Sequence, residues 1–405
     1  MRQTLTGRGI QSGRLIMKIL FVTPWFPTAN ANSAEAHQGL FEYRQAVEMV
    51  KRGHEFCVIT MRWGDQPFSE NFGDKIRVYR IKPVFIFPRI RYPVPNIFSL
   101  DSIIKNNCNK YCPDVIVYSH MAFLTALPVI WIKKIPSVVT TDGFPGISWF
   151  YGDKRVDFIG RLYTKVIMAR MIKSSKGIQL FNNKLLSDEK YFTTKFKNVL
   201  VCSNGVDTNI FKPGDDRQEI RDTLNLKAND FVILFVGRFD LVKGVNYLIE
   251  SAKVIISKYS RAKFILVGDG SLRKEYEILA SSYQNIIFLG WRDDIPQLMR
   301  MSDIFVLPSL SEGLPNVIME AIASGLPVIA SDVGGVSQLI TNQETGILIQ
   351  PKDIDALVSS IDKFITEPLL TERLGKSGRL KIVENYSWDI ICEKLEKYFS
   401  AIVAK

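Results

Sequence analysis

The sequence predicts an α/β protein made of two doubly wound, Rossmann-like domains. Three features lead to this prediction: a length of 405 residues, short apolar runs that alternate with longer helical patterns, and a polar, turn-rich segment near the middle. A chain of this length is too long for one ordinary hydrophobic core. Apolar runs without polar alternation are typical of parallel strands covered on both faces, and their alternation with helices indicates repeated βαβ units.

The predicted strands follow one another along both halves of the chain. In the first half they are residues 18–23, 55–60, 76–80, 114–119, 137–141, 177–181 and 199–202. In the second half they are residues 231–237, 262–267, 285–289, 304–308, 327–330 and 346–349. The clearest helical patterns between them are residues 40–52, 245–259 and 315–324.

The domain boundary is predicted near Asn204-Gly205, a turn signal that opens a polar linker. Residues 17–203 then form the first domain and residues 204–387 the second. Residues 388–405 form an amphipathic helix with no strand after it, which we expect to cross back to the first domain. Residues 1–16 carry three arginines without an apolar run, so we expect a disordered leader rather than a secretory signal.

Composition excludes several classes of protein. The apolar fraction of 46% and the charged fraction of 23% are ordinary for a globular chain, which argues against disordered and fibrous classes. No run approaches the roughly 18 apolar residues of a membrane span. The five cysteines are odd in number and scattered, which favours reduced thiols and a cytoplasmic location. With three histidines in the whole chain, we expect no metal site.

The charge is unevenly divided between the two halves. Residues 1–203 hold 29 Lys and Arg against 14 Asp and Glu, whereas residues 204–405 hold 23 against 27. This asymmetry indicates an anionic partner for the first half alone. A phospholipid surface and a phosphate-bearing acceptor fit equally well; nucleic acid is disfavoured because no nucleic-acid motif is present.

The segment from Glu312 to Glu320 is the strongest candidate site, because it follows a predicted strand and opens a helix. The backbone amides of Gly313, Leu314 and Asn316 would gather at a positive helix N-terminus, where doubly wound sheets bind nucleotides. Glu320, one turn deeper, suits a ribose diol, and Glu312 suits sugar hydroxyls. The alternative is that both are ordinary acids flanking a helix.

Two cations reinforce this candidate. Arg238 ends the first strand of the second half, and Lys243 opens the following helix. Fixed cations beside a phosphate site neutralise a diphosphate leaving group as charge develops on it. The alternative is a solvated loop, in which Arg and Lys are common.

The first half contributes weaker candidates. Gly39 at a helix start would allow close backbone approach to a diphosphate, and His120 ends a strand at a functional edge. A surface loop and a core histidine are the respective alternatives, and His54 is predicted to be structural. Aromatic and basic residues mix in a Pro-rich loop over residues 80–100 and again over residues 154–176. Such mixtures suit a membrane interface or a lipid-tailed acceptor, or else a buried apolar face.

Taken together, these motifs resemble the family 4 glycosyltransferases. The likeness covers nearly the whole chain from Met17 and is densest over residues 203–355: the Asn-Gly-Val-Asp linker, Gly-Arg-x4-Lys-Gly, Val-Gly-Asp-Gly, the Glu-x7-Glu pair and Val-Gly-Gly. The resemblance implies the GT-B fold, in which two Rossmann-like domains face each other across a cleft. It also implies retaining transfer of a sugar without an essential metal or other cofactor, the nucleotide-sugar being a co-substrate.

The resemblance assigns roles to individual residues. It implies that Arg238 and Lys243 bind the donor diphosphate, Glu320 the ribose and Glu312 the transferred sugar. Many members carry His-Gly after the fifth strand of the first domain, where this chain has Asp142-Gly143. Asp142 is therefore the candidate for the polar contact to the sugar, with His120 and His37 as possible helpers.

The expected function is transfer of a hexose from a UDP-, GDP- or similar sugar to a lipid-linked or glycan acceptor in cell-surface polysaccharide or glycolipid biosynthesis. We expect a cytoplasmic protein, peripheral to the inner membrane face through its basic first half. The alternatives are a nucleotide-sugar epimerase of the same fold and a non-catalytic nucleotide-sugar binding protein.

Overall fold

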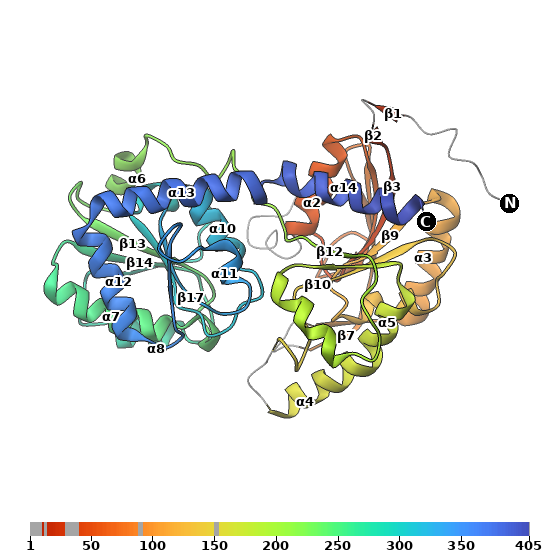
Figure 1. The fold of residues 1–405 in the computed structure, drawn as a ribbon, viewed down its shortest axis with the longest axis horizontal. Coiled ribbons are helices and arrows are strands. Elements are labelled where there is room, and N and C mark those ends of the chain that lie inside the picture. The colour runs from red at the N-terminus through yellow and green to blue at the C-terminus, as the bar shows by residue number, and fades with distance from the viewer. Residues whose placement is uncertain (1–9, 12–13, 29–39, 88–91, 150–153, 405) are drawn as a thin grey trace. The chain divides into compact units, whose positions relative to one another are not determined.

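The computed structural model describes residues 10–11, 14–28, 40–87, 92–149 and 154–404 (Figure 1). The chain divides into two compact units. The first comprises Met1–Asn204 and Ile391–Lys405, and the second comprises Gly205–Ile390. The sequence placed these boundaries at 203/204 and 387/388. Within the predicted leader, β1 (Ile10–Gln11) pairs with β2 (Arg14–Leu15) in antiparallel fashion.

The first unit is built on an eight-stranded sheet in the order β12-β11-β10-β9-β3-β4-β6-β5. Its strands are β3 (Lys18–Val22), β4 (Glu55–Met61), β5 (Ser69–Phe72), β6 (Ile76–Ile81), β9 (Val115–Tyr118), β10 (Ser137–Thr141), β11 (Gly177–Leu180) and β12 (Val199–Val201). Neighbouring strands are parallel, except that the edge strand β5 runs antiparallel to β6. Chain order reverses at β3, since β4 lies on one side of it and β9 on the other.

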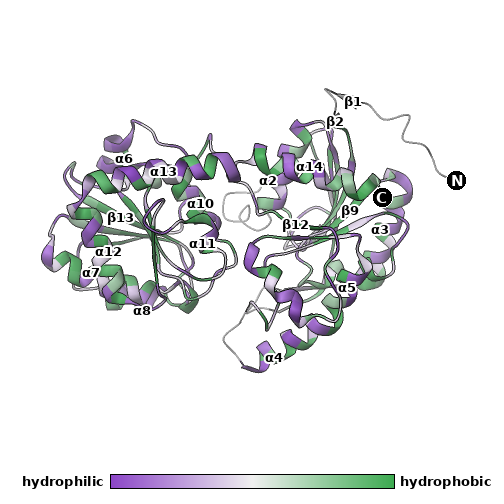
Figure 2. Ribbon diagram, viewed as in Figure 1, coloured by the Kyte–Doolittle hydropathy of each residue, from purple (hydrophilic) through white to green (hydrophobic). Residues whose placement is uncertain are grey.

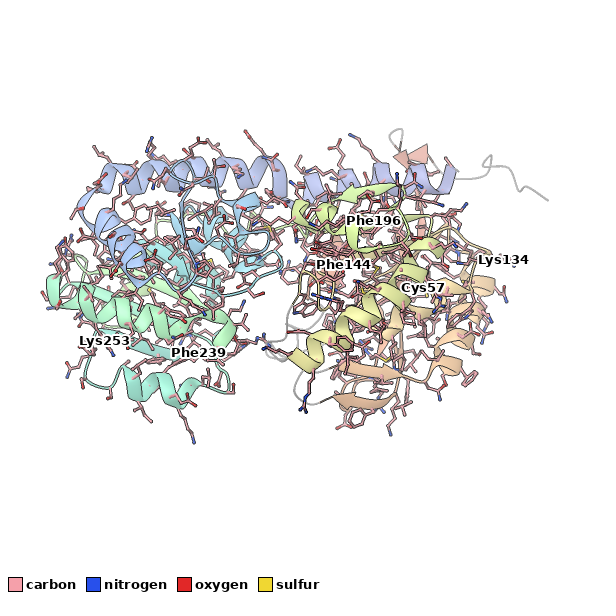
Figure 3. All side chains as sticks on the ribbon, turned by 60° about the horizontal axis from the view of Figure 1, so that its bottom comes forward. Cys57, Lys134, Phe144, Phe196, Phe239 and Lys253 are labelled. Atoms are coloured by element: carbon pink, nitrogen blue, oxygen red, sulfur yellow. The ribbon has the colours of Figure 1, made fainter. Side chains whose placement is uncertain are left out.

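Helices cover this sheet. They are α2 (Leu40–Lys51), α3 (Ile97–Tyr111), α4 (Lys154–Tyr163), α5 (Ala169–Ser174) and the end of α14 (Trp388–Ala404), with a π-helical turn η2 (Thr164–Met168) and 3-10 segments η1 (Leu124–Ile130) and η3 (Asn183–Tyr191). Asn96 caps α3, since its side chain accepts from the Ser99 amide. In the core, the Phe144 ring lies 5.9 Å from that of Phe196, centroid to centroid (Figure 3).

The second unit has a six-stranded, wholly parallel sheet in the order β15-β14-β13-β16-β17-β18. Its strands are β13 (Phe231–Val236), β14 (Ala262–Val267), β15 (Ile286–Gly290), β16 (Ile304–Leu307), β17 (Val328–Ser331) and β18 (Ile347–Ile349). Figure 2 shows mainly hydrophobic residues along the central strands, as expected for strands covered on both faces. The apolar core includes Phe239, which is fully buried (Figure 3).

The second unit carries helices on both faces of its sheet. They are α6 (Arg217–Thr223), α7 (Val245–Lys258), α8 (Arg273–Leu279), α9 (Ile295–Met301), α10 (Asn316–Ala323), α11 (Val336–Leu339), α12 (Ile354–Thr366) and α13 (Pro368–Tyr386), and a 3-10 turn η4 (Leu241–Lys243). The two sheets and their helices confirm the predicted fold class of two doubly wound domains. Among the helices of the described ranges, none has the length and apolar character that crossing a bilayer requires.

The last helix, α14, packs on the first unit. Its Glu396 accepts from the Nε2 atom of His54 at 3.0 Å, and the Nδ1 atom of His54 accepts from the Met17 amide. The hydroxyl of Tyr398 donates to the carbonyl of Asn198 at 2.6 Å. Its apolar face is buried through Ile391, Cys392, Leu395, Phe399 and Ile402. His54 therefore has the structural position that the sequence predicted.

One local prediction was wrong. Residues 80–100 were expected to be a Pro-rich loop, but they contain the antiparallel pair β7 (Pro83–Phe87) and β8 (Tyr92–Pro95) and the start of α3. Prolines are tolerated there because this isolated pair leaves backbone amides outside any ladder.

Candidate functional site

The second unit has a topological switch point between β13 and β16. From β13 the chain moves to β14 and β15 on one side of the sheet, and then returns to β16 on the other. In open α/β sheets, ligands bind at the carboxyl ends of the two strands that flank such a reversal. The loops at this point are residues 237–244 and 308–315, which contain most of the residues predicted to bind the donor.

Lys243 and Glu312, one from each loop, meet in the structure. The Lys243 Nζ atom lies 2.7 Å from the Glu312 Oε1 atom, and the Ser309 hydroxyl donates to the same oxygen at 2.6 Å. The side chains of Lys243 and Glu312 are 18% and 8% exposed, so water screens this pair only partly. Lys243, which was predicted to bind the diphosphate, and Glu312, which was predicted to bind the sugar, thus form one cluster.

Close backbone approaches hold three loops around this cluster. Gly244 has a φ of +65°, and a Cβ atom there would lie 2.1 Å from the Pro308 carbonyl oxygen. Gly334, in the turn after β17, has a φ of +54°, and a Cβ atom would lie 1.8 Å from the Glu312 carbonyl oxygen. The Gly335 amide also donates to the Gly313 carbonyl at 2.7 Å. Only glycine fits such contacts in this backbone conformation.

The N-terminus of α10 lies beside the same loop. The amides of Gly313, Leu314 and Asn316 donate to no acceptor among the described residues. The Asn316 Oδ1 atom is buried, also without a hydrogen-bond partner in the described part of the chain. Unused amides at the positive end of a helix favour an anion. Glu320 follows one turn further along α10 and is half-buried.

Arg238 is placed differently from the other candidates. Its side chain is 78% exposed and pairs with Asp240 at 3.1 Å, so it lies on the loop but outside the Lys243–Glu312 cluster. Gly39 and His37 lie outside the described residues, and the structure places neither of them.

The first unit also has a switch point, between β3 and β9, and His120 lies there. His120 follows β9 with a φ of +52°, a conformation that costs a non-glycine residue about 1–2 kcal/mol. Its amide donates to the Thr140 hydroxyl at 3.1 Å. Asp142 follows the neighbouring strand β10, so the carboxyl edge of the sheet brings both predicted residues together.

A carboxylate faces each nitrogen of the His120 ring. The Nε2 atom lies 2.7 Å from the Glu42 Oε1 atom, and the Nδ1 atom lies 3.7 Å from the Asp142 Oδ1 atom. Burial acts to lower the pKa of His120, but Asp142 and Glu42 outweigh it and raise this pKa to about 10. Burial acts to raise the pKa of Asp142, but the His120 imidazolium outweighs it and holds that pKa below its usual value.

Sequence reasoning missed Glu42 and Ser309. Glu42 lies 78 residues from His120 in the chain, and an acid in the first turn of a helix is ordinary. Ser309 lies three residues before Glu312, and its position after a parallel strand was the only signal for it. Neither residue belongs to a motif, so only the folded contacts reveal them.

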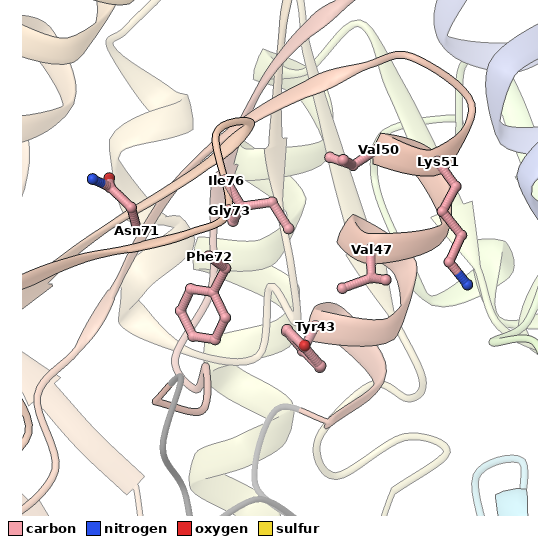
Figure 4. A pocket seen from close by; sticks show the side chains of 8 residues that line it. All are labelled: Tyr43, Val47, Val50, Lys51, Asn71, Phe72, Gly73 and Ile76. Atoms are coloured by element: carbon pink, nitrogen blue, oxygen red, sulfur yellow. The ribbon is translucent and has the colours of Figure 1, made fainter.

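A separate groove of about 400 Å³ lies between α2 and the β5–β6 edge of the first sheet (Figure 4). It is lined by Tyr43, Val47, Val50, Lys51, Asn71, Phe72, Gly73 and Ile76. Among the described residues that line the groove, Lys51 is the one cation, and it pairs with Glu48 at 2.7 Å.

Two doubly wound units, each with polar loops at its switch point, have the architecture of the GT-B glycosyltransferases. Residues 42–210 match the family model described as Glycosyltransferase Family 4, and residues 216–381 match the model described as Glycosyl transferases group 1. The chain belongs to the family 4 glycosyltransferases, which confirms the resemblance seen in the sequence.

The relatives of this chain include glycosyltransferases of polysaccharide biosynthesis. An Escherichia coli UDP-Gal:α-D-GlcNAc-diphosphoundecaprenol α-1,3-galactosyltransferase is 35% identical over 218 residues, which cover 51% of this chain and 55% of that protein. The match thus spans about half the length of that relative. The capsular polysaccharide biosynthesis glycosyltransferase CapM of Staphylococcus aureus is 29% identical over 290 residues, or 70% of this chain and 73% of CapM.

A solved structure shares the fold over nearly the whole chain. Anabaena HepE, crystallised with UDP and glucose, superposes with a TM-score of 0.72 at 19% identity. The match covers 95% of this chain and 100% of HepE. At this identity the likeness establishes the fold.

Proposed function

We propose that this glycosyltransferase moves a hexose, with retention of anomeric configuration and without an essential metal, from a UDP-sugar to a lipid-linked or glycan acceptor. The observation that carries the proposal is the Lys243–Glu312 cluster beside the unused amides of α10. The choice of UDP rests on the E. coli relative, whose name contains UDP-Gal, and on HepE, which was crystallised with UDP and glucose. The lipid-linked acceptor rests on the E. coli relative alone.

The proposed chemistry depends on stabilising a leaving group. As the bond from the sugar to the diphosphate breaks, negative charge grows on the diphosphate. The Lys243 ammonium and the positive end of α10 would take up that charge. Glu312, released from Lys243 when the diphosphate replaces it, would accept hydrogen bonds from the sugar. Glu320 would accept hydrogen bonds from the ribose, and Arg238 would reach the diphosphate from its exposed position.

A thermal-shift screen tests the choice of donor. We expect UDP-sugars to raise the melting temperature more than GDP-, ADP- or dTDP-sugars at equal concentration. A ligand at about 100 times its dissociation constant adds about 2.7 kcal/mol to the unfolding free energy. If no UDP-sugar shifts the melting temperature and another nucleotide-sugar does, the choice of UDP is wrong.

Product analysis then tests the reaction itself. With the selected donor and a membrane extract as acceptor, NMR of the product should show the anomeric configuration of the donor, and EDTA should leave the rate unchanged. Conversion of the donor sugar in the absence of acceptor would instead indicate an epimerase. Donor binding without turnover would indicate a non-catalytic binding protein.

We further propose that the protein acts at the inner, anionic face of the cytoplasmic membrane through α4 and η2. The apolar side chains Phe158, Ile159 and Leu162 are 70%, 65% and 57% exposed on α4, a costly arrangement in water. Lys154 and Lys165 are exposed on the same stretch. A helical surface that combines exposed apolar and basic residues suits an anionic bilayer interface.

Vesicle sedimentation tests this surface. We expect the protein to bind vesicles containing anionic lipid, and added salt to weaken this binding. The double variant Phe158→Ser/Leu162→Ser should bind at least about tenfold more weakly, because each large apolar side chain contributes about 1.5–3 kcal/mol on burial. Leu369→Ser removes an 82%-exposed leucine from α13 of the second unit and should leave binding unchanged. Equal binding by wild type and the double variant would contradict this membrane surface.

A further inference from the structure

The cluster around His120 contains a residue with no role in the function proposed above. Glu42 lies in the first turn of α2, and its side chain is nearly inaccessible, with the residue only 6% exposed. A carboxylate loses hydration in such a place unless a cation or hydrogen-bond donors replace the water. Its Oε1 atom lies 2.7 Å from the His120 ring, and the Ser119 hydroxyl lies 3.4 Å from the same oxygen.

The arrangement also fixes the protonation of His120. Both ring nitrogens face carboxylate oxygens, which accept but cannot donate protons when ionised. A neutral imidazole would leave one nitrogen lone pair facing a negative oxygen. An imidazolium instead donates a hydrogen bond to Glu42 at 2.7 Å and pairs by charge with Asp142, whose Oδ1 atom at 3.7 Å lies beyond hydrogen-bond distance. Around the ring, Trp25, Phe123 and Phe181 lie with ring centroids 6.1, 6.4 and 5.9 Å away, and they leave the His120 side chain 18% exposed.

Among the described residues, no charged group other than Glu42 and Asp142 acts on the charge of the His120 ring. The elements that face the ring contribute Glu42 from α2, Asp142 from the end of β10, and uncharged aromatic rings from the segments after β3, β9 and β11. The imidazolium between two carboxylates leaves one net negative charge. Asp142 is the member of the cluster that is most accessible to solvent, since its side chain is 33% exposed at the carboxyl edge of the sheet.

We propose that Glu42 is a positioning residue, which holds His120 as an imidazolium so that the Asp142 carboxylate stays ionised and fixed at the carboxyl edge of the first sheet. For the transfer reaction, and resting on the function proposed above, the ionised Asp142 would accept a hydrogen bond from a sugar hydroxyl. It would also oppose the positive charge that develops on the sugar. Glu42 would not contact the substrate itself and would act only through His120.

The direct test is the protonation state of His120, read by long-range ¹H–¹⁵N NMR of the ring nitrogens in the free protein. The chain has three histidines, so His120 is assigned from the spectrum of His120→Gln. We expect the imidazolium pattern at pH 7.5 in the wild type, with titration far above pH 6.5. In Glu42→Gln, the same ring should titrate at least one pH unit lower, because one of its two carboxylates is gone. A neutral His120 ring at pH 7.5 in the wild type would overturn the proposal.

The pH dependence of transfer provides a second readout. The charged form of His120 is the protonated one, so losing Glu42 weakens the cluster as pH rises, not as it falls. The activity of Glu42→Gln relative to wild type should therefore decrease steadily from pH 6.5 to pH 9, and Glu42→Asp should restore part of it. A variant that merely loosened the fold would lower activity by the same factor at every pH, and that result would count against positioning.

The controls separate this proposal from the proposed function. Glu48→Gln, on the same helix, removes a carboxylate that pairs with Lys51 and should leave both the His120 signal and the pH profile unchanged. The NMR measurement needs no donor or acceptor. If transfer is absent but His120 is an imidazolium that depends on Glu42, the transfer function fails and the positioning of Asp142 stands. If Glu42→Gln does not fold, the wild-type spectrum alone still decides the protonation state.

Discussion

Lys243→Ala should lower the transfer rate about 10²–10³-fold, the usual effect of removing one preorganised charge-stabilising group. The variant should also bind the donor more weakly, since no other cation meets Glu312 among the described residues. Calorimetry with UDP and with the intact UDP-sugar measures this loss. Because the variant leaves a nearly buried carboxylate unpaired, we expect an additional loss of about 1–3 kcal/mol in unfolding free energy.

Two comparisons make this result specific. Lys253→Ala removes a lysine of α7 that pairs with Glu250 at 2.8 Å, away from the donor loops, and should retain transfer and donor binding (Figure 3). Lys243→Ala/Glu312→Gln should recover most of the stability, because the unpaired charge is gone, without recovering transfer. Wild-type affinity for UDP in folded Lys243→Ala would show that the diphosphate binds elsewhere.

Gly334→Ala should destabilise the second unit by about 3 kcal/mol or more and abolish donor binding. The added Cβ atom would lie 1.8 Å from the Glu312 carbonyl oxygen, so the backbone of the donor loop must move. Chemical denaturation gives the loss of stability, and UDP binding at a temperature where the variant is folded gives the effect on the site. This turn thus fixes the position of Glu312 through its main chain.

Gly73→Ala is the matched control. Gly73 has a comparable φ of +59°, but a Cβ atom there meets nothing within 4 Å. That substitution should cost only the strain of the left-handed conformation, about 1–2 kcal/mol, and leave donor binding intact. If the two variants lose the same stability, steric contact with the donor loop is not what requires glycine at position 334.

The sequence predicted the inner strands of both sheets because those strands are buried on both faces and therefore continuously apolar. β13, for example, was expected at residues 231–237 and is found at Phe231–Val236. The antiparallel strands β5 and β7 escaped prediction. β5 (Ser69–Phe72) is an edge strand with alternating exposure, and β7 begins with a proline, Pro83. β5 therefore lacks the continuous apolar run on which the other predictions depended, whereas the prolines around β7 favoured a loop.

Within the candidate site, the sequence allowed us to predict the residues that lie at strand ends and helix starts. Lys243, Glu312 and Asn316 could be found in this way, since the carboxyl ends of parallel strands share one edge. The sequence did not predict that Lys243 pairs with Glu312, nor that the Glu42 carboxylate contacts the His120 ring. Those contacts depend on side-chain packing between segments distant in the chain, which no local pattern encodes.

The helix α14 has a consequence for how the protein is made. The first unit receives its last layer from the final residues of the chain, through the buried face of α14 and the contact of Glu396 with His54. During synthesis, residues 205–390 leave the ribosome as a continuous segment and can fold first. The amino-terminal domain, although most of it is translated earlier, is completed only when residues 391–404 have been synthesised and have packed against it.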